Sequence, residues 1–155
     1  MGELSVGDLA PDFDLEGNGG ERVSLTALKG KPVVVYFYPK DDTPGCTKEA
    51  IAFTGLIDEF SKIGATVIGL SPDTAAKHDK FAAKHGLAVR LGADTETSTA
   101  EAYGVWVEKN MYGKKYMGVE RSTFLVDADG KIAQIWRKVK VPGHAEAVLE
   151  AVRAL

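Results

Sequence analysis

The sequence predicts an α/β fold in which helices flank a mixed central sheet. Runs of strand length alternate with helix-like segments along the chain, and such alternation is typical of a sheet covered by helices. Residues 33–38 (VVVYFY) form a continuous β-branched and aromatic run, as in a strand buried on both faces. Nearer the C-terminus, two apolar runs flank residues 127–130 (DADG), which indicates a hairpin.

The first half of the chain supplies most of these elements. Short extended pieces at 12–15 and 22–25 surround a glycine-rich turn, and the buried strand 33–38 follows. Residues 44–63 carry apolar side chains at three- and four-residue spacing, which predicts one helix ended by Gly64. Residues 65–70 (ATVIGL) predict a second buried strand. A helix over 72–85 then begins after a Ser71 cap.

The second half predicts a short helix at 94–103, the hairpin strands 122–126 and 131–136, and a last helix at 142–154. The sequence contains no linker, repeat or low-complexity tract. A length of 155 residues suits one domain, so we expect a single domain over 1–155.

Composition and charge exclude several classes of function. The net charge of -3 argues against nucleic-acid binding, which requires a concentrated basic face. No apolar run reaches 18 residues, so no membrane span is expected, and the N-terminus lacks the pattern of a signal peptide. A single cysteine cannot form an internal disulfide or a zinc site with two thiolates. We therefore expect a cytoplasmic protein without metal or cofactor.

The segment after the first buried strand carries the chemistry. Thr43 lies at the expected N-cap of the next helix, Pro44 at its first position and Cys46 in its first turn. Free backbone N–H groups and the helix dipole favour a thiolate there, which is the nucleophilic form. Most free cysteines are buried and inert. The position of Cys46 after a Thr-Pro-Gly loop argues against burial and favours reactivity.

The pattern Pro39-x-x-x-Thr43-x-x-Cys46 resembles the active-site motif of the peroxiredoxins. The Thr-Pro-Gly-Cys-Thr core is similar to the subfamily called bacterioferritin comigratory protein, or peroxiredoxin Q. Residues 6–13 (VGDLAPDF), 104–106 (GVW) and 120–127 (ERSTFLVD) extend the resemblance over nearly the whole chain.

The resemblance implies a thioredoxin-like fold with an N-terminal extension. It also implies a thiol peroxidase that reduces hydrogen peroxide and organic hydroperoxides through a Cys46 sulfenic acid. By this resemblance, Thr43 would hydrogen-bond the peroxide, Pro39 would shield the pocket and Arg121 would complete the site. Glu49, one turn after Cys46, would orient Arg121 as a supporting partner.

The chain departs from many relatives in lacking a resolving cysteine. Ile51 and Ala82 stand where relatives carry that second thiol. Either the protein is a natural one-cysteine enzyme, or Ala82 is an engineered replacement. In both cases thioredoxin, glutaredoxin or a small thiol must reduce the enzyme. Relatives of this subfamily are often monomeric, so a monomer is expected.

Two other functions are the alternatives to a peroxidase. A redox-inactive thioredoxin-like binding module is the main alternative, and peroxide reactivity of Cys46 separates the two. A disulfide oxidoreductase is disfavoured because Thr43 replaces the first cysteine of Cys-x-x-Cys. His78 and His85 are interpreted as solvated, and His144 as a local contact. A solvated face explains the remaining basic cluster best: Lys109, Lys114, Lys115, Arg137, Lys138 and Lys140.

Overall fold

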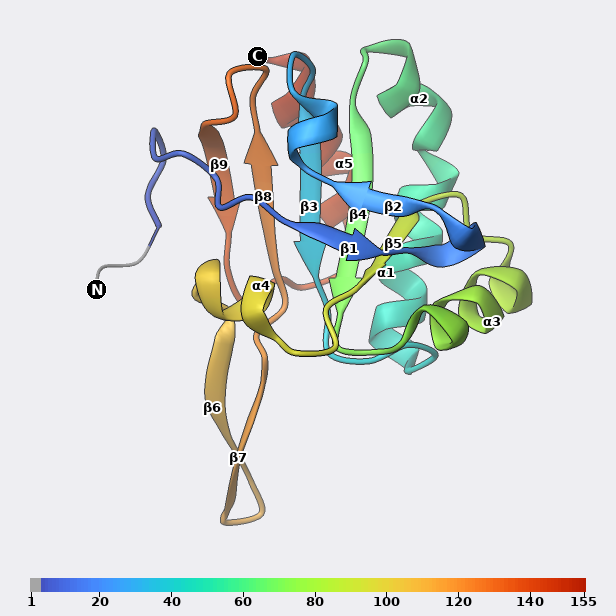
Figure 1. The fold of residues 1–155 in the computed structure, drawn as a ribbon, viewed down its shortest axis with the longest axis vertical. Coiled ribbons are helices and arrows are strands. Elements are labelled where there is room, and N and C mark those ends of the chain that lie inside the picture. Colours follow the sequence, from blue (N-terminus) through green and yellow to red (C-terminus); the bar gives the residue numbers. More distant parts are fainter. Residues whose placement is uncertain (1–3) are drawn as a thin grey trace.

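A five-stranded mixed sheet forms the centre of the molecule (Figure 1), with the strand order β5-β4-β3-β8-β9. The computed structural model describes residues 4–155. Residues 1–3 lie outside the described part; they begin the N-terminal segment in which the sequence shows no signal-peptide pattern. The strands are β3 (Val33–Phe37), β4 (Thr66–Ser71), β5 (Arg90–Ala93), β8 (Ser122–Val126) and β9 (Ile132–Trp136). Strands β3, β4 and β5 are parallel, whereas β8 and β9 are antiparallel to their neighbours, which confirms the mixed sheet.

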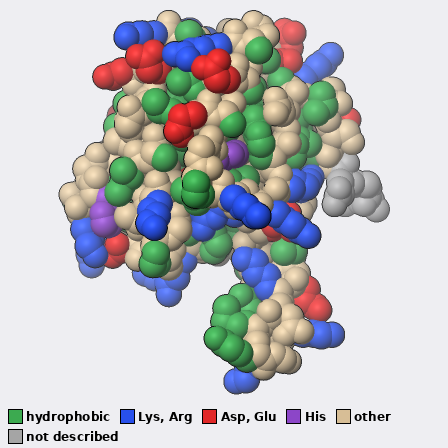
Figure 2. Space-filling view, turned by 180° about the vertical axis from the view of Figure 1, so that it is seen from behind, with side chains coloured by type: hydrophobic (Ala, Val, Ile, Leu, Met, Phe, Trp, Pro, Cys, Tyr) green, Lys and Arg blue, Asp and Glu red, His purple; other side chains and the backbone are tan. Residues whose placement is uncertain are grey.

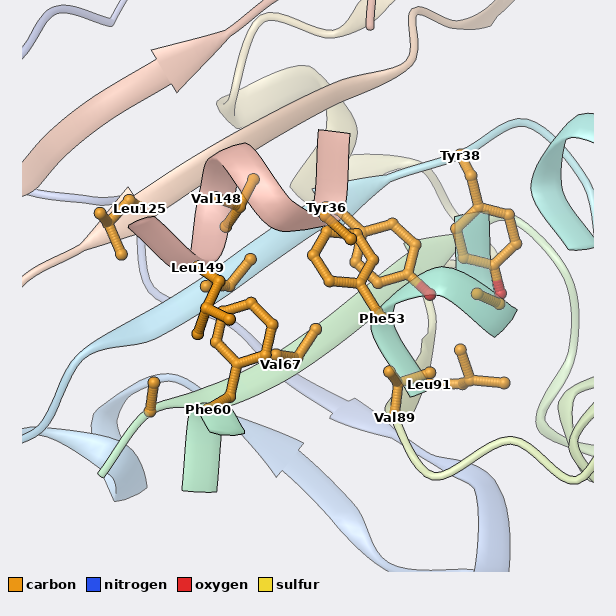
Figure 3. Close-up of a cluster of buried hydrophobic side chains, with 14 of the residues drawn as sticks. Tyr36, Tyr38, Phe53, Phe60, Val67, Val89, Leu91, Leu125, Val148 and Leu149 are labelled. Atoms are coloured by element: carbon orange, nitrogen blue, oxygen red, sulfur yellow. The ribbon is translucent and has the colours of Figure 1, made fainter. Parts of the chain in front are cut away.

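One face of the sheet is covered by helices (Figure 1). These are α1 (Pro44–Gly55), α2 (Ile57–Lys62), α3 (Ala75–His85) and α5 (His144–Arg153). Side chains that point to this face of the strands, such as Val34, Tyr36 and Leu125, pack with Phe53 and Val148 from the helices. Figure 3 shows this cluster, with the Tyr36 ring stacked on Phe53 at a centroid distance of 4.8 Å.

The opposite face is covered by the N-terminal extension and by α4 (Ser98–Ala102). The extension contains β1 (Asp14–Glu16) and β2 (Arg22–Ser24), which pair as an antiparallel ribbon, and two short 3₁₀ turns at Asn18–Gly20 and Thr26–Leu28. A second buried cluster lies beneath it and includes Phe13, Phe37, Ile68, Tyr103 and Phe124. The extension therefore completes the core that the sheet alone would leave open.

Three predicted helices differ from the structure, one of which, expected over 94–103, is only the five-residue α4. The helix expected over 44–63 is interrupted at Leu56, whose φ of -108° and ψ of 6° separate α1 from α2. Gly55, a weak helix former, lies directly before the break. The helix expected from residue 72 begins at Ala75, because Ser71 ends β4 and Thr74 is the N-cap that accepts from the Lys77 amide.

Three strands were not predicted. The first is β5, and the others are β6 (Trp106–Met111) and β7 (Lys114–Val119), which pair as a hairpin that projects from the body. Figure 2 shows hydrophobic side chains gathered on this hairpin, with basic side chains near them. The exposed apolar residues there are Met111, Tyr112, Tyr116 and Met117.

Neither a membrane span nor a metal cluster is found in the described part of the chain. No helix within residues 4–155 combines the length and apolar character needed to cross a bilayer. The same residues contain no group of three or more His, Cys, Asp or Glu side chains arranged to hold a metal ion.

Gly69 of β4 lies opposite Tyr36 of β3, and this close approach yields a stability prediction. A Cβ at Gly69 would lie 2.6 Å from Cζ and 2.7 Å from Oη of Tyr36, whose ring is fully buried. We expect Gly69→Ala to lower the free energy of unfolding by about 1–3 kcal/mol, measured by urea denaturation. Gly55→Ala, whose Cβ meets no atom within 4 Å, is the control. Equal effects of the two substitutions would contradict this account.

Candidate active site

The site lies where β3 ends and α1 begins, at the carboxyl edge of the parallel strands (Figure 1). The Tyr38 amide donates to the Leu70 carbonyl at 3.1 Å, so the pairing with β4 extends one residue beyond β3. Pro39 follows, half-buried, and opens the loop that leads to Thr43. Such edges are where open α/β sheets bind their ligands.

Thr43 occupies the N-cap position of α1, as predicted, with an extended backbone and Pro44 next to it. Its hydroxyl does not cap the helix; it donates to the Lys40 carbonyl at 2.8 Å. The single hydroxyl proton is therefore engaged within the loop, and the oxygen retains lone pairs that can accept a hydrogen bond.

Cys46 is only 2% exposed and packs within the helix-side core cluster, so the expectation that it would avoid burial was wrong. Its place in the first turn of α1 is nevertheless as predicted. The sulfur also has a polar partner, because Arg121 Nη2 donates to Sγ at 3.2 Å. Burial here shields a sulfur that faces a permanent cation, which is unlike the surroundings of an inert core cysteine.

Arg121 reaches Cys46 across 75 residues of sequence because of strand pairing. It directly precedes β8, and Ser122 of β8 pairs with Phe37 at the carboxyl end of β3. Gly45 leaves room for the guanidinium, since a Cβ there would lie 3.2 Å from Nη2 of Arg121. This role of Gly45 was not predicted, although the residue belongs to the quoted motif.

Glu49 holds the other end of the guanidinium. Arg121 Nη1 donates to Glu49 Oε1 at 2.6 Å, and the Glu49 side chain is 1% exposed. The guanidinium thus spans the carboxylate and the sulfur. The structure brings Cys46, Arg121 and Glu49 into direct contact, with Thr43 and Pro39 in the adjoining loop.

Burial and the neighbouring charges have opposite effects on the pKa values of Glu49 and Arg121. Burial raises the pKa of Glu49 to about 7, although the Arg121 guanidinium opposes the rise. Burial disfavours the charge on Arg121, but Glu49 and Cys46 outweigh that effect and raise the pKa of the guanidinium. Glu49 is therefore only partly ionised near neutral pH.

This shift predicts the pH dependence of stability. The pKa of Glu49 lies at about 7 in the folded state and at 4.5 for the ordinary group, so the folded state binds more protons between these values. Stability therefore falls as the pH rises through this window. We expect Glu49→Gln, relative to the parent, to gain up to about 3 kcal/mol between pH 5 and pH 8 in urea denaturation. Glu101→Gln, which changes an exposed carboxylate of α4, is the control. If the free energy of unfolding changes with pH in the same way in Glu49→Gln and in the parent, the prediction is contradicted.

Lys109, expected on a solvated face, is half-buried and brings a further cation near the site. Its side-chain stem packs over Gly118, where a Cβ would lie 3.2 Å from Cδ of the lysine. Burial lowers the pKa of Lys109, as does the charge of Arg121, whereas Cys46 and Glu120 oppose the change. The prediction missed this residue because it depends on the hairpin β6–β7.

The burial of His78 and His144 also differs from what the sequence predicted. His78 is fully buried and hydrogen-bonded, so its assignment as solvated was wrong. The expectation that His144 makes a local contact was also wrong, because it is buried against Thr123 of β8, 21 residues away, with 2.8 Å between Nε2 and Oγ1. Burial lowers the pKa of His144 to about 4, and the charge of Arg121 acts in the same direction.

The positions expected to hold a resolving cysteine lie on different helices. Ile51 is exposed on α1, whereas Ala82 of α3 is partly buried against the helix-side core. Cys46 is the single cysteine of the sequence.

Comparisons with known proteins agree with this geometry. The model of the AhpC/TSA family matches residues 6–135. Peroxiredoxin Bcp of Bacillus subtilis is 48% identical over 150 residues, which cover 97% of this chain and 96% of the relative. Peroxiredoxin Bcp of Xanthomonas campestris is 50% identical over 143 residues, covering 92% of this chain and 89% of the relative.

Solved structures give the same result. The bacterioferritin comigratory protein of Xanthomonas campestris, described for its alkyl peroxide reduction activity, matches with a TM-score of 0.90 at 47% identity, covering 97% of this chain and 96% of that one. A cysteine-to-serine mutant of Xylella fastidiosa PrxQ matches with a TM-score of 0.93 at 39% identity, covering 99% and 98%. The chain therefore belongs to the AhpC/TSA family and is a peroxiredoxin of the Bcp, or peroxiredoxin Q, group.

Proposed function

We propose that Cys46 is the nucleophile that reduces hydrogen peroxide and organic hydroperoxides to water and alcohols. The observation that carries this assignment is the Arg121 guanidinium, which donates to Cys46 Sγ at 3.2 Å and to Glu49 Oε1 at 2.6 Å. A hydrogen bond from a permanent cation stabilises an anionic sulfur. Glu49 fixes the plane of the guanidinium so that its donors face the sulfur.

The reaction follows from the placement of these groups. The thiolate attacks one peroxide oxygen, the S–O bond forms and the O–O bond breaks. The leaving oxygen takes the electron pair and a proton, and Cys46 becomes a sulfenic acid. Arg121 stabilises the negative charge that develops on the leaving oxygen. The free lone pairs of the Thr43 oxygen accept from the peroxide O–H group, and half-buried Pro39, which has no N–H, shields the loop.

The sulfenic acid is reduced by an external thiol in this proposal, because the chain has no second cysteine. Thioredoxin, glutaredoxin or a small thiol fills that role, and no cofactor or metal takes part. We propose a monomer that works in the cytoplasm, where such thiols are kept reduced.

The test mixes the reduced protein with one equivalent of hydrogen peroxide and follows intact mass and free thiol. We expect rapid gain of one oxygen atom, and dimedone should label Cys46. Each candidate thiol is then added to the oxidised protein, and the one that restores the free thiol fastest is assigned as reductant. If Cys46 reacts no faster than free cysteine, the peroxidase is rejected and a redox-inactive thioredoxin-like binding module becomes the working hypothesis.

A further inference from the structure

A buried polar network holds the loop between Pro39 and Thr43 from the side of α3. Asp41 lies in this loop and is 9% exposed, while His78 of α3 is fully buried. His78 Nδ1 lies 2.6 Å from Asp41 Oδ2, and the Tyr38 hydroxyl donates to Asp41 Oδ1 at 2.6 Å. The carboxylate of Asp41 is thus fixed by two side chains that come from outside the loop.

His78 is itself fixed by β5. Its Nε2 lies 2.9 Å from the Gly92 carbonyl, which can only accept, so Nε2 carries a proton. The ring therefore presents Nδ1 to Asp41 in one orientation. Whichever of the two groups holds the shared proton, the 2.6 Å contact ties the loop to α3.

The backbone of Asp41 is fixed separately. Its amide donates to Asp73 Oδ2 at 2.7 Å, and Ser71 at the end of β4 donates to the same oxygen at 2.7 Å. Asp73 is 9% exposed, and its own amide donates to Ser71 Oγ at 3.2 Å. The Asp73 carboxylate is therefore a rigid acceptor attached to the sheet.

One peptide unit connects this network to Thr43. The amide of Asp41 and the carbonyl of Lys40 belong to the same planar group, and they point in opposite directions because the peptide is trans. The amide donates to Asp73, while the carbonyl accepts the hydroxyl proton of Thr43 at 2.8 Å. The direction of that carbonyl sets the rotation of the Thr43 hydroxyl, and hence the direction of its lone pairs.

We propose that Asp73 and His78 are positioning residues for the peroxidase reaction: they orient the Lys40–Asp41 peptide and, through it, the Thr43 hydroxyl that receives the peroxide. This inference rests on the proposed function and adds residues that do not touch the substrate. Asp42 supports it, because its backbone has a φ of 61° and its side-chain carboxylate contacts Lys84 and His85 of α3. A strained loop of this kind keeps its shape only while its surroundings hold it.

The test compares two reactions of Cys46 in each variant. The rate constant with hydrogen peroxide depends on the Thr43 hydroxyl, whereas the rate constant of alkylation by iodoacetamide reports the sulfur alone. We expect Asp73→Ala to lower the ratio of the two rate constants about tenfold or more, because small misplacements at a reacting centre have effects of this size. Asp73→Asn keeps an oxygen that accepts from Asp41 and Ser71, so its ratio should stay within about twofold of the parent.

Two further variants separate positioning from a purely structural role. In a Thr43→Val background, Asp73→Ala should have little further effect on the ratio, since the two changes act through one hydroxyl. Asp79→Ala is the matched control, because it removes an exposed contact of α3 with Gly19, away from this loop, and it should leave the ratio unchanged. If Asp73→Ala does not fold, His78→Gln, which loses the Asp41 contact, carries the same expectations.

The outcomes are distinct. A normal ratio in Asp73→Ala, or an equal loss in Asp73→Asn, would overturn the positioning role even if stability falls. Full additivity with Thr43→Val would overturn it as well. Failure of the proposed function is recognised separately, because the parent protein itself would then react with peroxide no faster than free cysteine.

Discussion

Cys46→Ser is expected to abolish peroxide reduction, with a loss of at least about 10⁴-fold in rate. The serine hydroxyl stays protonated beside Arg121, and a hydroxyl cannot pass through a sulfenic acid. No other thiol exists in the sequence to replace it. Peroxide consumption in the presence of excess dithiothreitol measures the effect.

The change should leave the fold intact, since Cys46 is a small side chain in the first turn of α1. Equal urea midpoints for the reduced parent and the variant, within about 1 kcal/mol in free energy, would verify this. Thr47→Ser, at the next residue of the same helix, provides a matched control for conservative change near the site. Residual peroxidase activity in Cys46→Ser above the uncatalysed rate would show that the nucleophile lies elsewhere.

Arg121→Ala is expected to have the second-largest effect, lowering the rate of reaction with peroxide by about 10²–10³-fold. The guanidinium is the group that donates to the sulfur at 3.2 Å, and it carries a permanent charge. Arg121→Lys should recover little of this loss, because one ammonium group does not reproduce the planar fork that spans Cys46 and Glu49. Stopped-flow oxidation of Cys46 under excess peroxide measures both variants.

The same substitution leaves the buried Glu49 carboxylate without its cation, so stability should fall most above pH 7. The double variant Arg121→Ala/Glu49→Gln separates the two consequences. It should recover stability while the slow reaction with peroxide persists. If the double variant also recovers the rate, Arg121 acts by maintaining the fold rather than by contacting the reacting atoms.

The central strands that could be predicted have mostly apolar sequences. The runs that became β3, β4 and β8 are buried on both faces, whereas β9 is mostly half-buried and was indicated by the DADG turn before it. The hairpin of β6 and β7 has polar and apolar residues in no regular order, because much of it faces solvent. Strand β5 is only four residues long and contains Arg90 and Gly92, neither of which signals a strand.

In the candidate site, too, only the features set by local sequence could be predicted. Local physics places Cys46 in the first turn of a helix, but nothing local joins it to Arg121, which arrives through the antiparallel pairing of β8 with β3. Only the family resemblance indicated that contact. His78 was misassigned for a related reason: its partner Asp41 lies 37 residues away, so the helix pattern alone gave no cause to bury an imidazole.

The deep placement of Cys46 has a consequence for how the enzyme tells its two substrates apart. Cys46 is only 2% exposed, so its sulfur is easier to reach for a small peroxide than for the cysteine of another protein. We therefore expect the first turn of α1 to open before a protein thiol can reduce Cys46, and such opening would compete with the arrival of a second peroxide. The slower that local opening, the larger the fraction of molecules that continue to the sulfinic acid. On this expectation, the stability of one helical turn would set the peroxide concentration at which the protein inactivates itself.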